Sequence, residues 1–250
     1  MKIGLMGFGR AGKAVASIIL NNEKYILQWV LRKSHILEHR SVPEFFGIKS
    51  NEPGYLYSIQ SINIKELMDE QPVDYIVDFS TSNAIYEYGE AAANKKVKII
   101  SAISHYAKKE IEFLKRLSEN TAVFWSPNIT IGVNFLMLAA RFLKKMVPTI
   151  DTAIIEEHYR QKENVSGTAL KICEYIDVPP SEIKSIRVGG IVSKHEVIFG
   201  FPYQTVRIIH EAISREAFGN GVLFVADNLK DKEKGLYKFE DIMLPYFQHS

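Results

Sequence analysis

The sequence predicts an α/β protein that combines a doubly wound parallel sheet with a second, α+β domain holding a four-stranded mixed sheet. Three observations lead to this prediction. A strand, a glycine turn and a helix open the chain, strands and helices then alternate up to Trp125, and three β-rich runs later follow one another with no helix between them. Alternation is typical of parallel sheets, whereas consecutive strands are typical of antiparallel pairing.

Composition limits the classes of function. The 250 residues are 46% apolar, which is enough for one large domain or two modest ones. The net charge of +2, with both signs mixed along the chain, indicates no nucleic-acid partner. The single cysteine, Cys173, cannot form an internal disulfide and no zinc-type spacing occurs, so we expect no metal and a reducing, cytoplasmic setting. No apolar run approaches 18 residues and no cleavable signal opens the chain, so we expect no membrane segment.

A glycine motif follows the first strand. After the apolar residues 1–6 come Gly7, Phe8, Gly9, Arg10, Ala11 and Gly12, and then the apolar-periodic Ala14–Leu20. G-x-G-x-x-G between a strand and a helix is typical of a Rossmann-type dinucleotide-binding turn. Gly7 allows the tight turn, Gly9 lets a pyrophosphate approach the backbone, and Gly12 permits close packing of helix on strand. Glycine turns alone are common, but this strand–turn–helix context favours dinucleotide binding over an ordinary turn.

The second strand, Tyr25–Leu31, ends in Arg32, Lys33 and Ser34. NAD-binding proteins usually place an acidic residue at this point, where it holds the ribose 2′-hydroxyl. Two cations and a hydroxyl favour a 2′-phosphate instead, so we predict NADPH as cofactor, with NADH as the alternative. The competing interpretation is that both cations are solvated surface residues.

The remaining elements of the first domain continue the alternation. Loop signals dominate His35–Gly54, and the expected helices and strands are Ile62–Glu70 (helix), Asp74–Phe79 (strand), Ala84–Asn94 (helix), Val97–Ile100 (strand), Lys108–Glu119 (helix) and Ala122–Trp125 (strand). Ligands bind beyond the carboxyl ends of such strands. We therefore expect further cofactor contacts at Phe79, Ser80, Ser101, Ala102, Ile103, Ser126, Pro127, Asn128 and Ile129.

The second domain begins with a long apolar helix, Val133–Val147. Its predicted sheet contains Thr152–Glu156 and three later runs, which we expect to be antiparallel neighbours: Ile183–Val188, His195–Gly200 and Thr205–Ala212. A last helix, Arg215–Leu229, is expected to return to the first domain. Within the strands, His195 and His210 are interpreted as packed residues rather than catalysts.

The most reactive stretch is Glu156–Leu170, which follows a strand. His158 and Lys162 are four residues apart, so a helical or extended backbone would place them on roughly the same side. Ser166 reads as the N-cap of a helix, and the free N–H groups of a helix start bind carboxylate or phosphate. Two proton-carrying side chains therefore precede a site for an anion. The alternative is a polar loop followed by an ordinary capped helix.

Six segments carry a family resemblance: GFGRAG, VDFS, SPNITIGVNF, EEHYRQKENVSGTAL, VGGIVSKHEVIFG and SREAFGNGVLFVADNL. In their order and spacing they resemble the dihydrodipicolinate reductase family of lysine and diaminopimelate biosynthesis, over nearly the whole chain. The resemblance implies a dinucleotide-binding domain of residues 1–128 and 216–250, a substrate-binding and oligomerisation domain of residues 129–215, and a homotetramer formed through the substrate-domain sheets.

The resemblance also implies the reaction, in which NADPH reduces 4-hydroxy-tetrahydrodipicolinate (dihydrodipicolinate), a cyclic imine with two carboxylates, to tetrahydrodipicolinate. It implies that His158 and Lys162 carry the proton-transfer and cation roles. The substrate contacts that it implies are Tyr159, Ser166, Gly167 and Thr168.

The chain departs from the family pattern at two polar contacts. Tyr159 stands where the family usually has a second histidine, and Ile103 stands where it has a threonine that contacts cofactor and substrate. Isoleucine has no side-chain hydrogen-bond group. These departures leave two alternatives to the usual reaction: a related reductase of another cyclic imine, and a protein that binds NADP(H) as a sensor without turnover.

Overall fold

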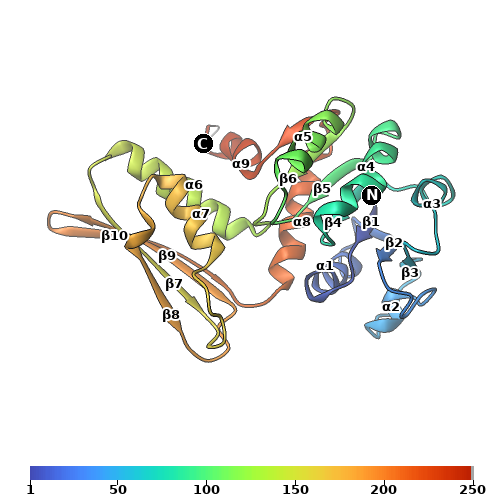
Figure 1. The fold of residues 1–250 in the computed structure, drawn as a ribbon, viewed down its shortest axis with the longest axis horizontal. Coiled ribbons are helices and arrows are strands. Elements are labelled where there is room, and N and C mark those ends of the chain that lie inside the picture. Colours follow the sequence, from blue (N-terminus) through green and yellow to red (C-terminus); the bar gives the residue numbers. More distant parts are fainter. Residues whose placement is uncertain (249–250) are drawn as a thin grey trace. The chain divides into compact units, whose positions relative to one another are not determined.

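The computed structural model describes residues 1–248, and the chain folds into two compact units. Unit 1 is Met1–Ile129 with Phe218–Ser250, and unit 2 is Thr130–Ala217. Figure 1 shows the elements of both. Among the helices of the described residues, none is both long and apolar enough to cross a membrane.

Unit 1 is built on a seven-stranded sheet in which every pairing is parallel, with the strand order β11-β6-β5-β4-β1-β2-β3. Its strands are β1 (Lys2–Met6), β2 (Ile26–Arg32), β3 (Tyr55–Ser58), β4 (Tyr75–Asp78), β5 (Lys98–Ser101), β6 (Ala122–Trp125) and β11 (Gly235–Tyr237). Its helices are α1 (Arg10–Leu20), α2 (Val42–Phe45), α3 (Ile64–Glu70), α4 (Ile85–Asn94), α5 (Lys108–Leu117), α8 (Glu216–Leu229, which begins in unit 2) and α9 (Phe239–Gln248), with a 3₁₀ turn at Ser82–Ala84.

Helices cover the two faces of this sheet, which is why its central strands are apolar on both sides. One apolar cluster joins α3, α4 and α5 to strand residues such as Trp29, Ile76 and Val123. On α1 and α8 the contact is close, because a Cβ on Gly219 would lie 2.5 Å from Ile18. The predicted doubly wound parallel sheet is confirmed.

Four elements at the margins of unit 1 were not predicted: α2, β3, α9 and β11. The two strands contain four and three residues and lie at the two edges of the sheet. A strand this short shows too little alternation to stand out from a loop in the sequence.

Unit 2 contains a four-stranded sheet of order β10-β9-β7-β8. Its strands are β7 (Asp151–His158), β8 (Ile183–Arg187), β9 (Ser193–Phe201) and β10 (Gln204–Ala212), and its helices are α6 (Ile131–Met146) and α7 (Gly167–Ile176), with a 3₁₀ turn at Pro180–Glu182. The mixed sheet is confirmed, but the expected antiparallel pairing of all three later strands is wrong. Strand β8 pairs in parallel with β7, and β9 lies on the other side of β7. Helix α7 links β7 to β8, and a helical crossover delivers the next strand in parallel.

Helices α6 and α7 lie on one face of this sheet (Figure 1) and form a single apolar core with it. The side chains of β7 alternate between this face and the other, with Thr152, Ile154, Glu156 and His158 buried. The core side of the strand therefore changes from apolar to ionisable residues as β7 approaches its carboxyl end.

Candidate active site

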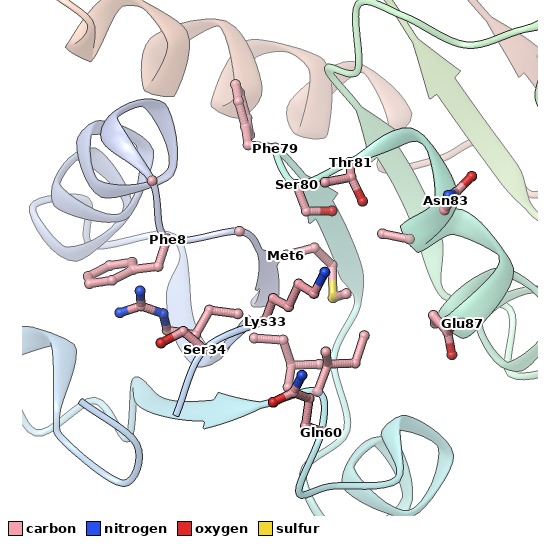
Figure 2. Close-up of a pocket in the computed structure, with 16 residues that line it drawn as sticks. Met6, Phe8, Lys33, Ser34, Gln60, Phe79, Ser80, Thr81, Asn83 and Glu87 are labelled. Carbon is pink, nitrogen blue, oxygen red and sulfur yellow. The ribbon is translucent and has the colours of Figure 1, made fainter. Parts of the chain in front are cut away.

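A pocket of about 560 Å³ lies beyond the carboxyl ends of β1, β2 and β4 in unit 1 (Figure 2). Predicted cofactor residues that line it are Gly7, Phe8, Gly9, Arg32, Lys33, Phe79 and Ser80. Figure 2 shows Lys33 reaching into the pocket, with Ser80 and Thr81 on the loop after β4 and Glu87 on α4. The structure thus brings the glycine turn, the cationic end of β2 and the end of β4 to one place.

The glycine turn has the geometry that an approaching phosphate needs. Gly7 adopts φ +95°, and a Cβ at Gly12 would lie 2.0 Å from the Gly7 carbonyl oxygen. A Cβ at Gly9, in contrast, would meet nothing within 4 Å. The first helical hydrogen bond of α1 runs from Lys13 N to Gly9 O, so the N–H groups of Arg10, Ala11 and Gly12 precede it and point out of the helix start. No acidic residue occupies this turn, and an anionic pyrophosphate fits it.

The two cations at the end of β2 differ in their partners. Arg32 donates a hydrogen bond to the Ile36 carbonyl at 3.0 Å, which keeps its guanidinium close to the pocket wall. Lys33 is exposed and points into the pocket. Glu38 is held elsewhere, because it accepts hydrogen bonds from Ser58 N and Ser61 Oγ.

A second pocket of unit 1, of about 330 Å³, lies beyond β4 and β5 and is lined by Phe79, Ser80, Thr81, Ser82, Ala102, Ile103, Ser104 and His105. Ile103 is 8% exposed, and its carbonyl accepts a hydrogen bond from Trp125 Nε1 at 2.9 Å. Ser101 is fully buried and its hydroxyl is hydrogen-bonded to Tyr106 OH, so this hydroxyl faces the protein interior and not the pocket. The predicted residues Ser126, Pro127, Asn128 and Ile129 follow β6 and line neither of these two pockets.

Asp78, which the sequence did not single out, fixes the loop that the two pockets share. It is fully buried, and it accepts hydrogen bonds from Ser80 N (2.8 Å), Ser80 Oγ (2.5 Å) and Tyr88 OH (2.9 Å). Burial raises the pKa of Asp78 to about 6, although these hydrogen bonds oppose the rise. The carboxyl group therefore sets the path of the backbone at Phe79 and Ser80.

In unit 2 the strand register assembles a polar row across the end of the sheet. His195 lies opposite His210 on β10 and opposite Glu156 on β7, and Glu156 lies opposite Ser185 on β8. Directly paired residues share one face of a sheet, and Glu156 belongs to the helix-covered face. The row therefore lies beneath the helices, beyond the apolar core, with His158 one step further along β7.

Glu156 is the centre of this polar cluster. Its carboxylate accepts hydrogen bonds from His158 Nδ1 (2.5 Å), Ser185 Oγ (2.6 Å), Ser166 N (3.3 Å) and both terminal nitrogens of Arg187 (2.9 and 2.6 Å). Burial alone would raise the pKa of Glu156, but the hydrogen bonds, with those from Arg187 the largest, lower it to about 2. Glu156 is therefore a buried carboxylate with charge-assisted partners on every side.

Two imidazoles meet beside this carboxylate. The rings of His158 and His195 lie 5.4 Å apart, nearly perpendicular to each other. Burial lowers the pKa of His158, with Glu156 opposing the shift, and burial together with the charge of the neighbouring His158 lowers the pKa of His195 to about 3. Both rings are therefore neutral near pH 7.

Ser166 marks the start of α7 as predicted, but its side chain does not cap the helix. The hydroxyl instead pairs with His195 Nε2 at 2.9 Å. The predicted role of a side-chain cap is wrong, because this buried hydroxyl has an imidazole partner that the sequence separates from it by 28 intervening residues. The N–H groups of the first turn, Gly167 and Thr168 included, lie at the helix start, where a Cβ on Gly167 would meet nothing within 4 Å.

Lys162 lies in neither a helix nor a strand, so its position relative to His158 is not set by the four-residue spacing between them. A turn bonded from Lys162 N to Tyr159 O (3.1 Å) brings it back toward the end of β7. Its ammonium is close enough to lower the pKa values of both His158 and His195. Tyr159 is 42% exposed at the same turn. The structure thus brings His158, Lys162 and the start of α7 together by a turn rather than by periodicity.

The place of His195 in the polar cluster was not predicted from the sequence. Its interpretation as a packed strand residue is correct for its 1% exposure, but it also belongs to the polar cluster. The signal was available in β9, where His195 shares the inward face with Val197 and Phe199. A histidine in that position needs a buried partner. Within residues 1–248, no group of three or more His, Cys, Asp or Glu side chains is arranged to hold a metal ion.

A glycine turn at the carboxyl end of a parallel strand, in a chain whose second unit carries neutral imidazoles and an ammonium, is typical of a dinucleotide-dependent oxidoreductase. The family models for the N-terminus and the C-terminus of dihydrodipicolinate reductase match residues 1–129 and 132–243. The chain belongs to the dihydrodipicolinate reductase family.

Similar proteins agree with this assignment. The 4-hydroxy-tetrahydrodipicolinate reductase of Caldanaerobacter subterraneus subsp. tengcongensis is 32% identical over 80% of this chain and 89% of its own. That of Thermosipho africanus is 32% identical over 74% of this chain and 86% of its own. The solved structure of a dipicolinate-bound dihydrodipicolinate reductase from Paenisporosarcina sp. TG-14 has the same fold, with a TM-score of 0.80 at 21% identity, covering 95% of this chain and 97% of that one.

Proposed function

We propose that the protein reduces 4-hydroxy-tetrahydrodipicolinate to tetrahydrodipicolinate with a nicotinamide cofactor, in lysine and diaminopimelate biosynthesis. The observation that carries the proposal is the polar cluster of unit 2. It places an imidazole, an ammonium and a helix start together in a chain whose family is the dihydrodipicolinate reductases. Curated relatives of similar length carry this activity in their names.

We assign the dinucleotide to unit 1 and the substrate to unit 2. The open space at Gly9 and the N–H groups at the start of α1 support a pyrophosphate site. We assign the dinucleotide-binding domain to residues 1–128 and 216–250 and the substrate-binding domain to residues 129–215. The second pocket supports cofactor contacts at Ala102 and Ile103.

A nicotinamide bound to unit 1 would supply the hydride that adds to the imine carbon, and the electron pair of the C=N bond would pass to the ring nitrogen. The protein must then stabilise negative charge and deliver a proton. We assign these tasks to Lys162 and His158, because the charge of Lys162 lowers the pKa of His158 and the two groups therefore act at one place in unit 2. The N–H groups at Gly167 and Thr168 hold a substrate carboxylate, because they lie at the N-terminus of α7.

We propose NADPH as the preferred form of the cofactor. Lys33 points into the first pocket and Arg32 lines it, so two cations are available for a 2′-phosphate. Replacing Arg32 by Asp and Lys33 by Ala together should move the ratio of cofactor affinities toward NADH. An unchanged ratio would contradict this assignment.

A coupled assay tests the function. Dihydrodipicolinate synthase generates the unstable substrate in the cuvette, and oxidation of NADPH is followed by its absorbance. We expect oxidation that depends on both enzymes and on the protein concentration. If NADPH is consumed no faster than without the protein, the proposed function is wrong.

A second substrate is favoured by one observation. Ile103 stands in the second pocket without a polar side chain, and Tyr159 is exposed at the turn beside His158. A less polar cyclic imine would suit these contacts better than a dicarboxylate. In that case the usual substrate turns over poorly, and the double change Ile103→Thr with Tyr159→His restores part of the rate.

We also propose a homotetramer that forms through the open face of the unit 2 sheet. This face carries Ile155, Ile198 and Ile209 next to two ion pairs, Glu157 with Lys194 and Glu196 with Arg207. Apolar side chains next to paired charges are suited to contact with another copy of the chain.

A further inference from the structure

One carboxylate touches every part of the proposed substrate site. Glu156 is fully buried, and its partners include His158, the backbone N–H of Ser166 and Arg187. The first belongs to the proposed proton-transfer pair, the second precedes the helix start that would hold a carboxylate, and the third reaches the turn that carries Lys162. Glu156 thus contacts the first two parts directly and the third through Arg187.

The two oxygens of Glu156 divide these contacts between them. Oε2 accepts from His158 Nδ1 at 2.5 Å and from an Arg187 nitrogen at 2.9 Å. Oε1 accepts from Ser185 Oγ, from the other Arg187 nitrogen and from Ser166 N. A carboxylate with this many donors is held in one orientation, since any rotation would break charge-assisted hydrogen bonds.

Arg187 extends the arrangement to the turn. While it pairs with Glu156 through both terminal nitrogens, its Nε donates to the Lys162 carbonyl at 2.8 Å and one terminal nitrogen donates to the Asn164 carbonyl at 3.0 Å. The planar guanidinium fixes these directions relative to one another. The position of the Lys162 backbone is therefore fixed, through Arg187, relative to the same carboxylate that holds His158.

The contact with Glu156 also decides where the proton of His158 lies. An ionised carboxylate can only accept hydrogen bonds, so Nδ1 must carry the hydrogen, and in the neutral ring Nε2 is then the unprotonated nitrogen. The groups that face His158 are Glu156 on its own strand, Arg187 on β8, His195 on β9 and Lys162 on the turn. Of these groups, Glu156 is the one that hydrogen-bonds to the ring.

We propose that Glu156 is a positioning residue: it holds His158 in the Nδ1–H form, with Nε2 presented for proton transfer, and through Arg187 it holds the Lys162 turn at a fixed distance from that ring. The catalytic consequence rests on the proposed function, whereas the protonation state of the ring does not. Glu156 itself contacts no reacting atom.

The protonation state of His158 is tested by solid-state ¹⁵N NMR of histidine-labelled protein near pH 7. The His158 signal is identified as the one that disappears in His158→Gln. We expect the wild-type ring to carry its hydrogen on Nδ1, and Glu156→Gln to shift it toward Nε2 or toward a mixture. Glu157→Gln is the matched control, because Glu157 is the next residue of β7, on the other face, and is paired with Lys194. Its His158 signal should match the wild type. A wild-type ring with hydrogen on Nε2, or a Glu156→Gln signal identical to the wild type, would overturn the proposal.

Steady-state kinetics test whether Glu156 positions His158 and the Lys162 turn for catalysis. Glu156→Gln should lower kcat on the order of a hundredfold, since a misplaced ring or ammonium costs about that much, with little change in the KM for the cofactor. Arg187→Lys should lower kcat while leaving the His158 signal as in the wild type, because it disturbs the turn and not the ring. Equal kcat values for Glu156→Gln and Glu157→Gln would contradict the positioning role. If Glu156→Gln does not fold, the wild-type spectrum still tests the protonation state of His158, and the kcat of Arg187→Lys still tests the positioning of the Lys162 turn. Absence of turnover in the wild type would remove the proposed function and leave the NMR result standing.

Discussion

The backbone and the side chain of Lys162 have separate surroundings. Its carbonyl is held by Arg187, and its ammonium acts on the pKa values of two imidazoles. The ammonium can therefore be removed without releasing the turn. This makes Lys162 a suitable position for testing the proton-transfer assignment in isolation.

Lys162→Ala should lower kcat by about 10²-fold or more, the usual worth of a positioned proton donor, while cofactor affinity stays within about twofold. Cofactor titration by fluorescence and steady-state rates are the measurements. Lys171→Ala, an exposed lysine on α7, is the control and should keep the wild-type rate. An unchanged kcat for Lys162→Ala would rule out its role.

His195 should make stability depend on pH. Its pKa is about 3 in the folded protein because of burial, below the ordinary 6.5 of an unfolded chain. Below pH 6.5, His195 binds a proton in the unfolded state but stays neutral in the folded state. The contribution of His195 to the free energy of unfolding is therefore fully present above pH 6.5 and is lost as the pH falls toward 3. Between pH 7 and pH 5 this contribution amounts to roughly 2 kcal/mol.

Urea unfolding of the wild type and His195→Gln at the two pH values measures this contribution. The variant should lose roughly 2 kcal/mol less than the wild type on going from pH 7 to pH 5. His39→Gln, a change at an exposed histidine of unit 1, should behave as the wild type. If His195→Gln shows the full wild-type dependence, His195 is not held neutral.

Individual residues differ in how far the sequence predicts their roles. Gly7 and Gly12 follow from a local pattern, because a turn and a close approach involve neighbours in sequence. The partner of Ser166 could not be predicted, because His195 is placed beside it by strand order and register. Contacts that depend on register are not visible in one sequence.

At the scale of an element, the first strand–turn–helix separates glycines that serve the fold from one that serves a ligand. A Cβ added at Gly12 would lie 2.0 Å from the Gly7 carbonyl oxygen, whereas a Cβ added at Gly9 would meet no atom within 4 Å. Gly12→Ala should therefore lower the free energy of unfolding by about 1–3 kcal/mol or prevent folding. Gly9→Ala should keep the wild-type stability and weaken cofactor binding about tenfold or more. Thermal unfolding and cofactor titration distinguish the two, and a Gly9→Ala protein with wild-type affinity would contradict the phosphate site.

The elements themselves follow from the sequence where they are long and buried. The alternation predicted the parallel sheet of unit 1, since βαβ units have few other solutions. The short edge strands β3 and β11 were missed, and β8 was paired wrongly, because three to five residues do not specify a neighbour. Helix α7 was the available indication that β7 and β8 run in parallel.

At the scale of the whole molecule, the proposed tetramer predicts a mass close to four times the 28.5 kDa of the chain by sedimentation equilibrium. Ile209 is 54% exposed on the open face of the unit 2 sheet. Ile209→Asp should yield smaller species, because a carboxylate buried against another copy without a partner is costly. Ile36→Asp, at a 68% exposed residue of unit 1, should leave the mass unchanged. A monomeric wild type would end the tetramer proposal.

Unit 1 contains both ends of the chain, and this affects its synthesis on the ribosome. When Ile129 leaves the exit tunnel, the partner of Ile18 on α8 and the strand that pairs with β6 have not yet been translated. Unit 2 is contiguous and has all its strands once Ala212 has emerged. The nascent protein therefore completes unit 2 before unit 1, whose sheet stays unfinished, with apolar surface available to chaperones, until β11 has been translated.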